Sequence, residues 1–280
     1  MKIIEPKVEL LSEIGISPES HIARCARVCY GKEYKEPNQE ADKKMVDGLI
    51  KRNHLSMLRH NSAYFVFTNH LPEEFKSEYV NTLSQEDYIY ASTNGQFTLE
   101  HNNKADLNSH VFLNLCRKYP ELFKLYRLTF CITTQISTSR ELNRCSPNAI
   151  AERSTRYCSS KDGLLICRPW WLSSAKEAAF NSHSPINELW YYNNAISKVE
   201  EAYLTLLGQG MKPEDARGIL PLDTATKVIY TYSIREWKHI LDLRYYGTTG
   251  KPHPNAHVVM QIVKDQINDF AKEHNIEYQV

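Results

Sequence analysis

The segment from Ser137 to Tyr157, STSRELNRCSPNAIAERSTRY, gathers side chains that can bind an anion. It holds four arginines, two glutamates and six serine or threonine hydroxyls, directly after the apolar stretch LYRLTFCITTQI. Arginine binds phosphate through paired planar donors and keeps its charge at any working pH. A carboxylate can accept from a base N–H or orient an arginine. If residues 138–144 form a helix, Arg140 and Arg144 lie on one face of it.

Two later segments combine cations with apolar surroundings. ARGILPLDT places Arg217 beside a turn closed by Pro221. REWKHILDLR places Arg235 and His239 four residues apart on a predicted helix, and Arg244 follows one turn later. Taken singly, each cluster is also typical of solvated ion pairs, which contribute little stability. Because each cluster abuts an apolar strand or helix, where charge needs a partner, we interpret the three segments as anion-binding.

The composition excludes several other classes of protein. The formal charge of the 280 residues is only +1, so no global field recruits nucleic acid or a membrane, and an anion site must be local. No window approaches 18 unbroken apolar residues, and the start, MKIIEPKVELLSEIG, is too charged for a signal peptide. Seven cysteines without a CxxC pair favour reduced thiols. We therefore expect a cytoplasmic protein without a membrane span.

Several well-known functional motifs are missing from the sequence. The only Gly-x-Gly, GQG, ends a predicted helix and follows no strand, so no Rossmann fingerprint is present. There is no P-loop and no HExxH. His253 and His257 are four residues apart, but two ligands without a third make a weak metal site, and we interpret them as surface residues. We predict no metal.

The hydrophobic periodicity predicts a mixed α+β chain. Strands are expected over 62–68, 126–136 and 226–233, and helices over 17–31, 39–54, 185–210, 211–221, 234–246 and 255–274. Ser17 is the expected N-cap of the first helix. The polar segment 92–106 is expected to be a loop. We interpret residues 1–280 as a single domain with an insertion at about 70–118.

Five segments in order resemble the flavin-dependent thymidylate synthases, also called the thymidylate synthase complementing protein family. VELLS and ARCARVCY are similar to the opening strand and first helix of that family. NHLSMLRH resembles its gH-x-S-x-x-EH segment, and RCSPNAIAERSTRY lies where the family has RHR followed by S-x-R-Y. ARGILPLDTATKV and REWKHILDLR resemble its two C-terminal motifs. We identify no counterpart for the segment around 70–118.

The resemblance implies a fold, an assembly and a reaction. The implied fold is a central, mostly antiparallel sheet flanked by helices, assembled as a homotetramer with active sites shared between subunits. FAD is held without a Rossmann domain. The implied reaction is reductive methylation of dUMP at C5, with methylenetetrahydrofolate as carbon donor and NADPH as reductant of the flavin. The implied partners are nucleotide and folate substrates, and no enzyme cysteine need attack the uracil.

The resemblance also assigns residues to the site. Arg217 matches a nucleotide-binding position that can reach a neighbouring subunit, and Arg244 matches the arginine that contacts the pyrimidine and stabilises charge on it. The other positions on the nucleotide side are Arg144, Glu152, Ser154 and Arg156. The positions on the flavin side are His54, Ser56, Arg235 and His239.

The sequence departs from the family in the RHR motif, which here reads Arg144-Cys145-Ser146. The arginine on the nucleotide side is kept, and the His and Arg on the flavin side are lost. Glu141 replaces an amide near the nucleotide. Arg59 replaces the glutamate of the EH pair, and our hypothesis is that it restores the charge lost at 146. Cys145 is either a thiol nucleophile activated by Arg144 or a small replacement for histidine, and we favour the second interpretation.

A further replacement puts Ala149 where the family has a serine. These departures leave three functions open. The first is thymidylate synthesis, and the second is C5 methylation of another pyrimidine nucleotide such as UMP, which Glu141 suggests. The third is a non-catalytic relative that binds a nucleotide. The loss of the flavin-side residues favours this alternative, and the presence of Arg235, His239 and Arg244 argues against it.

Overall fold

The protein is described by a computed structural model that covers residues 1–32, 36–146, 149–156, 162–172 and 188–280. Its centre is a four-stranded antiparallel sheet in the order β2-β6-β9-β7. The strands are β2 (Lys7–Leu10), β6 (Arg127–Gln135), β9 (Ala225–Ser233) and β7 (Ala149–Glu152). The strands predicted over 126–136 and 226–233 are therefore confirmed, and they pair with each other.

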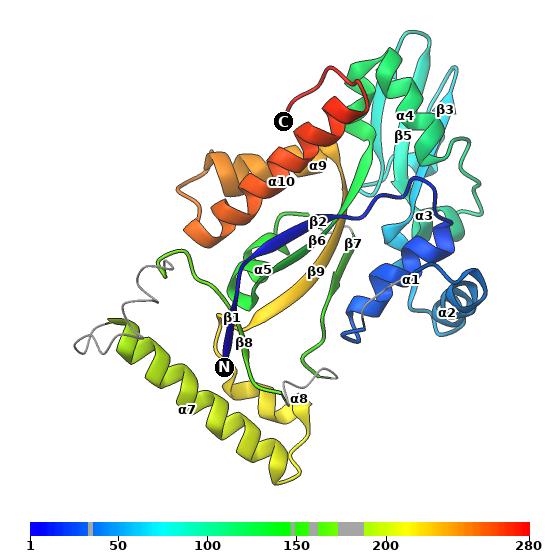
Figure 1. Ribbon diagram of the computed structural model, residues 1–280. Helices are drawn as coiled ribbons and strands as arrows, with labels where there is room; N and C mark the ends of the chain where they lie inside the picture. The colour runs from blue at the N-terminus through cyan, green and yellow to red at the C-terminus, as the bar shows by residue number, and fades with distance from the viewer. Residues whose placement is uncertain (33–35, 147–148, 157–161, 173–187) are drawn as a thin grey trace.

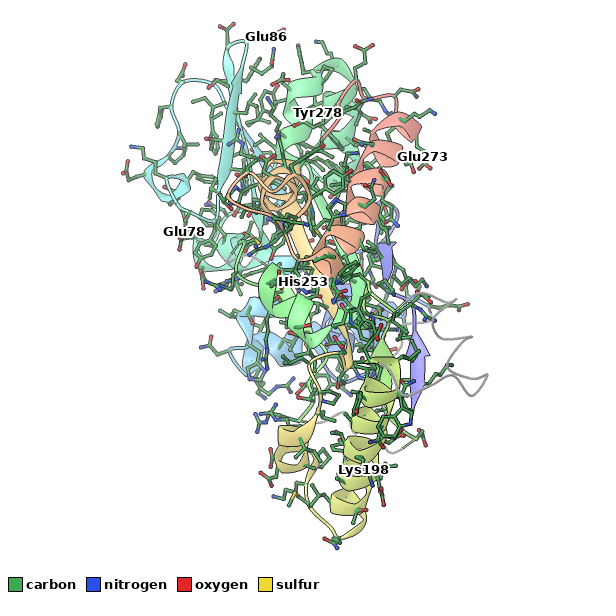
Figure 2. All side chains as sticks on the ribbon, turned by 90° about the vertical axis from the view of Figure 1, so that its left-hand side faces the viewer. Glu78, Glu86, Lys198, His253, Glu273 and Tyr278 are labelled. Carbon is green, nitrogen blue, oxygen red and sulfur yellow. The ribbon has the colours of Figure 1, made fainter. Side chains whose placement is uncertain are left out.

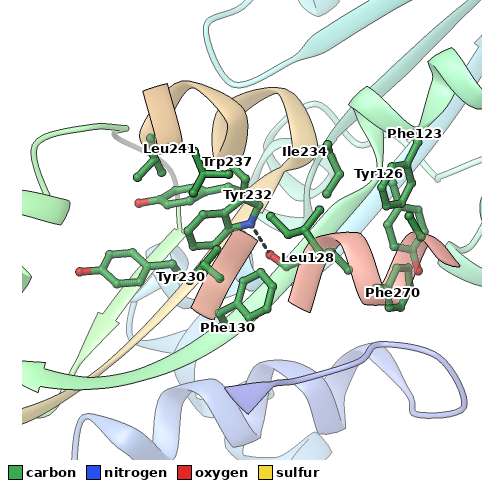
Figure 3. Packing of buried hydrophobic residues seen from close by; sticks show 14 of the residues in the cluster. Phe123, Tyr126, Leu128, Phe130, Tyr230, Tyr232, Ile234, Trp237, Leu241 and Phe270 are labelled. Carbon is green, nitrogen blue, oxygen red and sulfur yellow. Dashed lines mark hydrogen bonds between the residues drawn. The ribbon is translucent and has the colours of Figure 1, made fainter. Parts of the chain in front are cut away.

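The two central strands carry the largest hydrophobic core. Every residue of β6 is buried, and Phe130 of β6 lies opposite Tyr230 of β9. Helix α9 (Ile234–Leu241) covers this part of the sheet through Trp237, whose indole N–H donates to the Leu128 carbonyl at 3.1 Å. Figure 3 shows this packing, with Phe123, Tyr126 and Phe270 stacked beside it. Aromatic area of this size dominates the stability of a core.

Helices cover both faces of the central sheet (Figure 1). On one face lie α9, α10 (Pro254–Glu273) and the short α5 (Ile136–Leu142). On the other face lies α1 (Pro18–Val28), which packs against α2 (Gln39–Lys51). Ser17 caps α1 as predicted, because its side chain accepts from the Ser20 amide. The helices predicted over 17–31 and 39–54 are confirmed with shorter ends, and the helix predicted over 255–274 is confirmed one residue earlier, as Pro254–Glu273.

A second sheet, in the order β3-β5-β4, corrects the expectation for residues 92–106. Its strands are β3 (Ser62–Phe67), β4 (Asn81–Gln85) and β5 (Tyr88–Asn94), and α3 (Gly95–Glu100) and α4 (Ser109–Lys118) follow. The expected loop thus contains the end of β5 and all of α3. Three described 3-10 turns accompany these elements: η1 (Leu55–His60) precedes β3, η2 (Glu73–Phe75) lies between β3 and β4, and η3 (Pro120–Leu125) follows α4.

A third unit projects from the lower end of the central sheet in Figure 1. Its strands β1 (Lys2–Ile4) and β8 (Leu165–Cys167) pair in parallel, and its long helix is α7 (Glu188–Gly208). The helix predicted over 185–210 is confirmed from residue 188, and its first three residues lie outside the described chain. Helix α8 (Pro213–Ala216) and the turn η4 (Arg217–Ile219) complete the predicted 211–221 segment.

The whole arrangement is elongated. Figure 2 shows Lys198 of α7 and Glu86, between β4 and β5, at opposite ends of the molecule. The expectation of an α+β fold with antiparallel strands flanked by helices is confirmed, although the strands form three sheets. Among the described residues, no helix has the length and apolarity to span a bilayer.

The helix predicted over 234–246 changes its geometry before it ends. After α9 the helix continues as one turn of π-helix, η5 (Asp242–Tyr246). The helix ends at Gly247, which has a φ of 71°. A side chain at Gly247 would also collide with Pro252, because an added Cβ would lie 2.9 Å from its Cδ. Single π turns often occur at functional sites. Here the π turn carries Arg244.

Candidate active site

A cavity of 760 Å³ lies where α5, the end of β7 and η4 meet. A volume of this size is typical of small-molecule sites. Two of the three predicted anion-binding segments contribute to it, although they are more than 60 residues apart in the chain. The polar side chains in its lining are Ser139, Arg140, Glu152, Arg153, Ser154, Thr155 and Arg217.

Glu152 is the best-anchored side chain of this cavity. The hydroxyls of Ser139 and Thr226 donate to its Oε1 at 2.9 and 3.0 Å, and the Asn143 amide lies 3.4 Å from its Oε2. The Tyr230 hydroxyl in turn donates to Asn143 Oδ1 at 2.7 Å. Burial raises the pKa of Tyr230 well above its usual value, so the phenol stays a donor. The carboxylate is therefore fixed from three sides.

Arg156 and Arg217 meet beside the cavity at Glu214 of α8. Arg156 Nη2 lies 3.2 Å from the Glu214 carboxylate, and Arg217 Nε donates to the Glu214 carbonyl at 3.1 Å. Arg217 Nη1 also donates to Thr155 Oγ1 at 3.2 Å. Both arginines are exposed. An exposed ion pair of this kind costs little to open, so an arriving phosphate can displace Glu214.

Arg244, on η5, contacts the backbone of α5. Its Nη2 donates to the carbonyl of Glu141 at 3.2 Å, and the Cys145 thiol donates to the same carbonyl at 3.5 Å. The Nε–H of Arg244 is buried and has no acceptor among the described residues. A buried donor without a partner costs free energy, which a ligand acceptor can recover. Arg244, in the third predicted anion-binding segment, thus contacts Glu141 in the first of these segments.

Arg144 does not share a helix face with Arg140, which corrects that expectation. Helix α5 ends at Leu142 with Asn143 as its C-cap, so Arg144 lies in the loop beyond it and is exposed. Arg140 remains on α5 and lines the cavity. Asn143 keeps helical φ and ψ values of −60° and −17°, and its side chain contacts Tyr230 and Glu152.

The residues assigned to the flavin lie on η1 and α9. His54 and Ser56 are exposed at the start of η1, and within the described residues neither side chain has a hydrogen-bond partner. Arg235 and His239 are exposed on α9, and Arg235 gives one donor to the Thr82 carbonyl at 3.1 Å. Imidazole, hydroxyl and guanidinium donors open to solvent fit the phosphates and ring carbonyls of a flavin.

The residues that stand in place of family motif residues make contacts within the protein. Ser146 Oγ donates to the Glu236 carboxylate at 3.1 Å. A carboxylate therefore lies next to position 146, where the family has an arginine. Arg59 Nε donates to Gln96 Oε1 at 2.7 Å, and its guanidinium lies 4.9 Å from the centre of the Tyr79 ring. Our hypothesis that Arg59 replaces the lost charge therefore requires it to exchange Gln96 for a phosphate.

A buried polar network anchors η1 to the central sheet. His60 Nδ1 lies 2.8 Å from Thr231 Oγ1, Thr231 Oγ1 lies 2.8 Å from Thr129 Oγ1, and His21 Nε2 lies 3.1 Å from Thr129 Oγ1. Arg127 Nη2 donates to the carbonyl of Arg59 at 2.8 Å. Burial, with a smaller effect of Arg127, lowers the pKa of His60 to about 3. The network therefore holds His60 neutral.

Three residues around Glu152 were not singled out from the sequence. Ser139, Asn143 and Thr226 are common residue types, and each becomes important only because β9 pairs with both β6 and β7. The wealth of hydroxyls in residues 137–157 was the available signal. His253 and His257 are exposed at the start of α10, as interpreted from the sequence: His253 is the N-cap, and the His257 ring stacks on Tyr245 with a ring separation of 4.7 Å.

Comparison with known proteins shows the family. Residues 78–270 match the family described as "Thymidylate synthase complementing protein", which is more than half of the chain. The match begins inside the segment for which we identified no counterpart. The chain belongs to this family.

Individual relatives match over shorter stretches. A flavin-dependent thymidylate synthase of Halobacterium salinarum is 40% identical over 90 residues, which are 31% of this chain and 34% of that protein. A flavin-dependent thymidylate synthase of Synechocystis sp. is 26% identical over 158 residues, or 54% of this chain and 73% of that protein. The alignment thus spans about a third of the length of the first relative.

Among solved structures, the UMP/dUMP methylase PolB from Streptomyces cacaoi bound with 5-Br dUMP is 16% identical, with a TM-score of 0.45. The match covers 99% of this chain and 96% of that chain. A similarity of this size carries no argument about the function of the present protein.

Proposed function

We propose that the protein catalyses the FAD-dependent reductive methylation of dUMP at C5, with methylenetetrahydrofolate as carbon donor and NADPH as reductant. Family membership supports the reaction class. The observation that carries the proposal is the convergence of Glu152, Ser154, Arg156 and Arg217 around one cavity, with Arg244 at its neighbouring helix end.

In this proposal the cationic side of the cavity binds the nucleotide phosphate. Arg217 and Arg156 offer planar paired donors, and Ser154 adds a hydroxyl. When the phosphate binds, the two arginines exchange their contacts with Glu214 for stronger charge-assisted hydrogen bonds to the phosphate. Glu152, held by its three donors, then accepts from the nucleotide and fixes its orientation. Positioning of this kind supplies much of the rate enhancement in reactions without a covalent enzyme intermediate.

Arg244 has the electrostatic role in the chemical step. C5 of the pyrimidine is nucleophilic when the ring holds enolate-like negative charge on its carbonyl oxygens, and formation of the bond to the methylene carbon consumes that charge. A guanidinium with an unsatisfied buried donor stabilises that charge more than it stabilises the neutral ring. Arg144, Glu141 and the loop between them border the same position from the end of α5.

The flavin would be held by His54 and Ser56 of one segment and by Arg235 and His239 of another. Because the methylene carbon must gain a hydride to become a methyl group, a flavin held there would supply reducing equivalents taken from NADPH. Arg59 is the further cation proposed for its phosphates. We also propose that the site is completed by a neighbouring subunit of a homotetramer, and that the protein acts in the cytoplasm.

Tritium release tests the proposal. Purified protein with FAD, NADPH and methylenetetrahydrofolate should release tritium into water from [5-³H]dUMP, because methylation replaces the hydrogen at C5. The absence of release from both [5-³H]dUMP and [5-³H]UMP would reject the methylation chemistry and leave the non-catalytic nucleotide-binding alternative.

UMP is the second candidate substrate, and Glu141 is the feature that favours it. The residue replaces an amide of the family, and the hydrogen bond from Arg244 to its backbone carbonyl at 3.2 Å supports a position near the proposed pyrimidine. Faster tritium release from [5-³H]UMP than from [5-³H]dUMP would establish UMP as the preferred substrate.

A further inference from the structure

A second cavity, of 660 Å³, lies on the opposite face of the central sheet. Successive residues of β6 point to different faces: Phe130 packs against Trp237 of α9, while Cys131 belongs to a cluster with Cys25 of α1. The second cavity is lined by Cys131 and by residues of α1, β2 and β9. It is therefore separate from the nucleotide cavity.

The strands on either side of β6 place cations in one row along this cavity. In the register of the sheet, Lys7 of β2 lies opposite Thr133 of β6, and Thr133 lies opposite Lys227 of β9. The Arg153 amide extends this row, because it donates to the Lys227 carbonyl at 2.8 Å. With strands about 4.8 Å apart, the backbones of Lys7 and Lys227 are roughly 10 Å apart. Lys7, Arg153 and Lys227 all line the cavity.

This row of cations is only partly neutralised. Lys7 Nζ pairs with Glu9 at 2.7 Å. Among the residues that the structure describes, no carboxylate lies within 4.0 Å of the side-chain nitrogens of Lys227 or Arg153. A chain with a net charge of only +1 thus places Lys227 and Arg153, which have no carboxylate partner among the described residues, at one concave place.

The rest of the cavity lining is mixed, because Arg24 and Lys32 add two cations, Glu9 adds one carboxylate, and the other side chains are largely apolar. Leu11, Val28 and Ile229 contribute to it between the charged side chains. Cations beside an apolar surface suit a molecule with oxyanions on an apolar or aromatic body. Arg153 also lines the nucleotide cavity, so a ligand here would lie next to the nucleotide.

We propose that this cavity is a second small-molecule site, which binds a ligand with clustered oxyanions on an apolar body. Lys227 and Arg153 bind the oxyanions, Lys7 reinforces them, and the apolar lining holds the body of the ligand. Phosphates and the carboxylates of a short glutamate chain share this chemistry. The proposal does not depend on the methylation reaction, because its test measures binding alone.

The test is calorimetric titration of the full-length protein with pyrophosphate and, separately, with triglutamate. Lys227→Met keeps the aliphatic stem and removes the charge, so it should weaken binding of the preferred anion by about tenfold or more. The control Lys238→Met, on the exposed surface of α9, should bind as wild type, and Arg217→Met reports whether any anion binds in the nucleotide cavity instead. The anion that binds more tightly identifies the anionic group of the ligand.

Thermal unfolding provides a second measurement. The preferred anion should raise the Tm of wild type and of Lys238→Met, and should raise the Tm of Lys227→Met much less, because only the state that binds is stabilised. Three results would overturn the proposal. They are no binding of either anion, equal binding by wild type and Lys227→Met, and loss of binding in Arg217→Met alone, which would place the anion in the nucleotide cavity.

Discussion

Arg244 is the residue on which the proposed chemistry depends most. Its guanidinium is held through the Glu141 carbonyl, while its buried Nε–H is left for a ligand. Lysine has a point charge and lacks the planar donor pair. The orientation of the Arg244 fork therefore matters as much as its charge.

We predict that Arg244→Lys lowers the turnover number for tritium release from [5-³H]dUMP by about 10²-fold or more, which is typical for loss of one donor to a developing oxyanion. The KM for dUMP should change much less. Arg117→Lys on the exposed face of α4, where Arg117 binds the His274 carbonyl, is the control and should keep full activity. A variant with unchanged turnover would remove Arg244 from the chemical step.

Cys145 should be dispensable. Its thiol donates to the Glu141 carbonyl, which is an acceptor and not a base that could activate a nucleophile. We predict that Cys145→Ser keeps its turnover within about threefold of wild type, since a hydroxyl can make the same contact. A loss of activity beyond a hundredfold, with Cys29→Ser unaffected, would instead support the nucleophile.

The sequence was sufficient to predict part of the site and not the rest. Motif order predicted that the segment with Glu152 and the segment with Arg217 meet, and the structure brings both to one cavity. The neighbours of Glu152 depend on strand register, which one sequence does not define. The contacts of Arg59 with Gln96 and Tyr79 were also not predictable, because both partners lie in a segment without recognised motifs.

Among the helices, the α1–α2 pair depends on one buried carboxylate. Asp42 is fully buried on α2, accepts from Ser20 Oγ at 2.8 Å and pairs with Arg27 of α1 at 2.7 Å. Asp42→Ala would leave Arg27 without this partner. We predict a loss of about 2–4 kcal/mol in the free energy of unfolding, measured by urea denaturation.

The matched control is Asp47→Ala, which changes an exposed residue of the same helix and should cost less than about 0.5 kcal/mol. Equal losses from both substitutions would mean that the Asp42 contacts do not hold the two helices together.

The buried polar network that anchors η1 to the central sheet predicts how the stability of the protein depends on pH. The pKa of His60 is about 3 in the folded protein and near 6.5 when unfolded, so the unfolded state binds the extra proton. This part of the stability is complete above pH 6.5 and is lost progressively as the pH falls toward 3. Burial lowers the pKa of His21 as well, with the same sign.

We therefore predict that His60→Asn, which does not titrate, flattens the fall in Tm between pH 6.5 and pH 4. His70→Asn, an exposed loop residue, should follow the wild-type curve. A variant curve parallel to wild type would show that protonation of His60 does not contribute to acid unfolding.

Elements with a clear apolar period were predictable, and the segment around α3 was not. Strands β6 and β9 are long and rich in β-branched residues, and those residues are buried as predicted. Asn94 and Gly95 indicate a loop in sequence, but Asn94 Oδ1 caps α3 by accepting from the Gln96 and Phe97 amides. Gly95 is needed for tertiary reasons, because a Cβ there would lie 2.7 Å from the Leu58 carbonyl oxygen.

At the level of the whole molecule, the α7 unit leaves large apolar side chains exposed. Trp170 and Leu222 are each more than half exposed, and Trp190 and Tyr191 of α7 are also exposed. Clustered exposed apolar area indicates association. We predict a homotetramer, so light scattering should give about four times the mass of one chain, and Trp190→Asp with Tyr191→Asp should lower it. A monomeric wild-type protein would contradict the shared active site.

The central claim is that arginines from distant segments bind one pyrimidine nucleotide, and calorimetry with dUMP and deoxyuridine tests it most directly. The account predicts that wild type binds dUMP far more tightly than deoxyuridine. It also predicts that Arg217→Met loses about tenfold or more in dUMP affinity while its affinity for deoxyuridine stays unchanged. Equal affinity of wild type for the two ligands, or dUMP affinity unaffected by Arg217→Met, would contradict it.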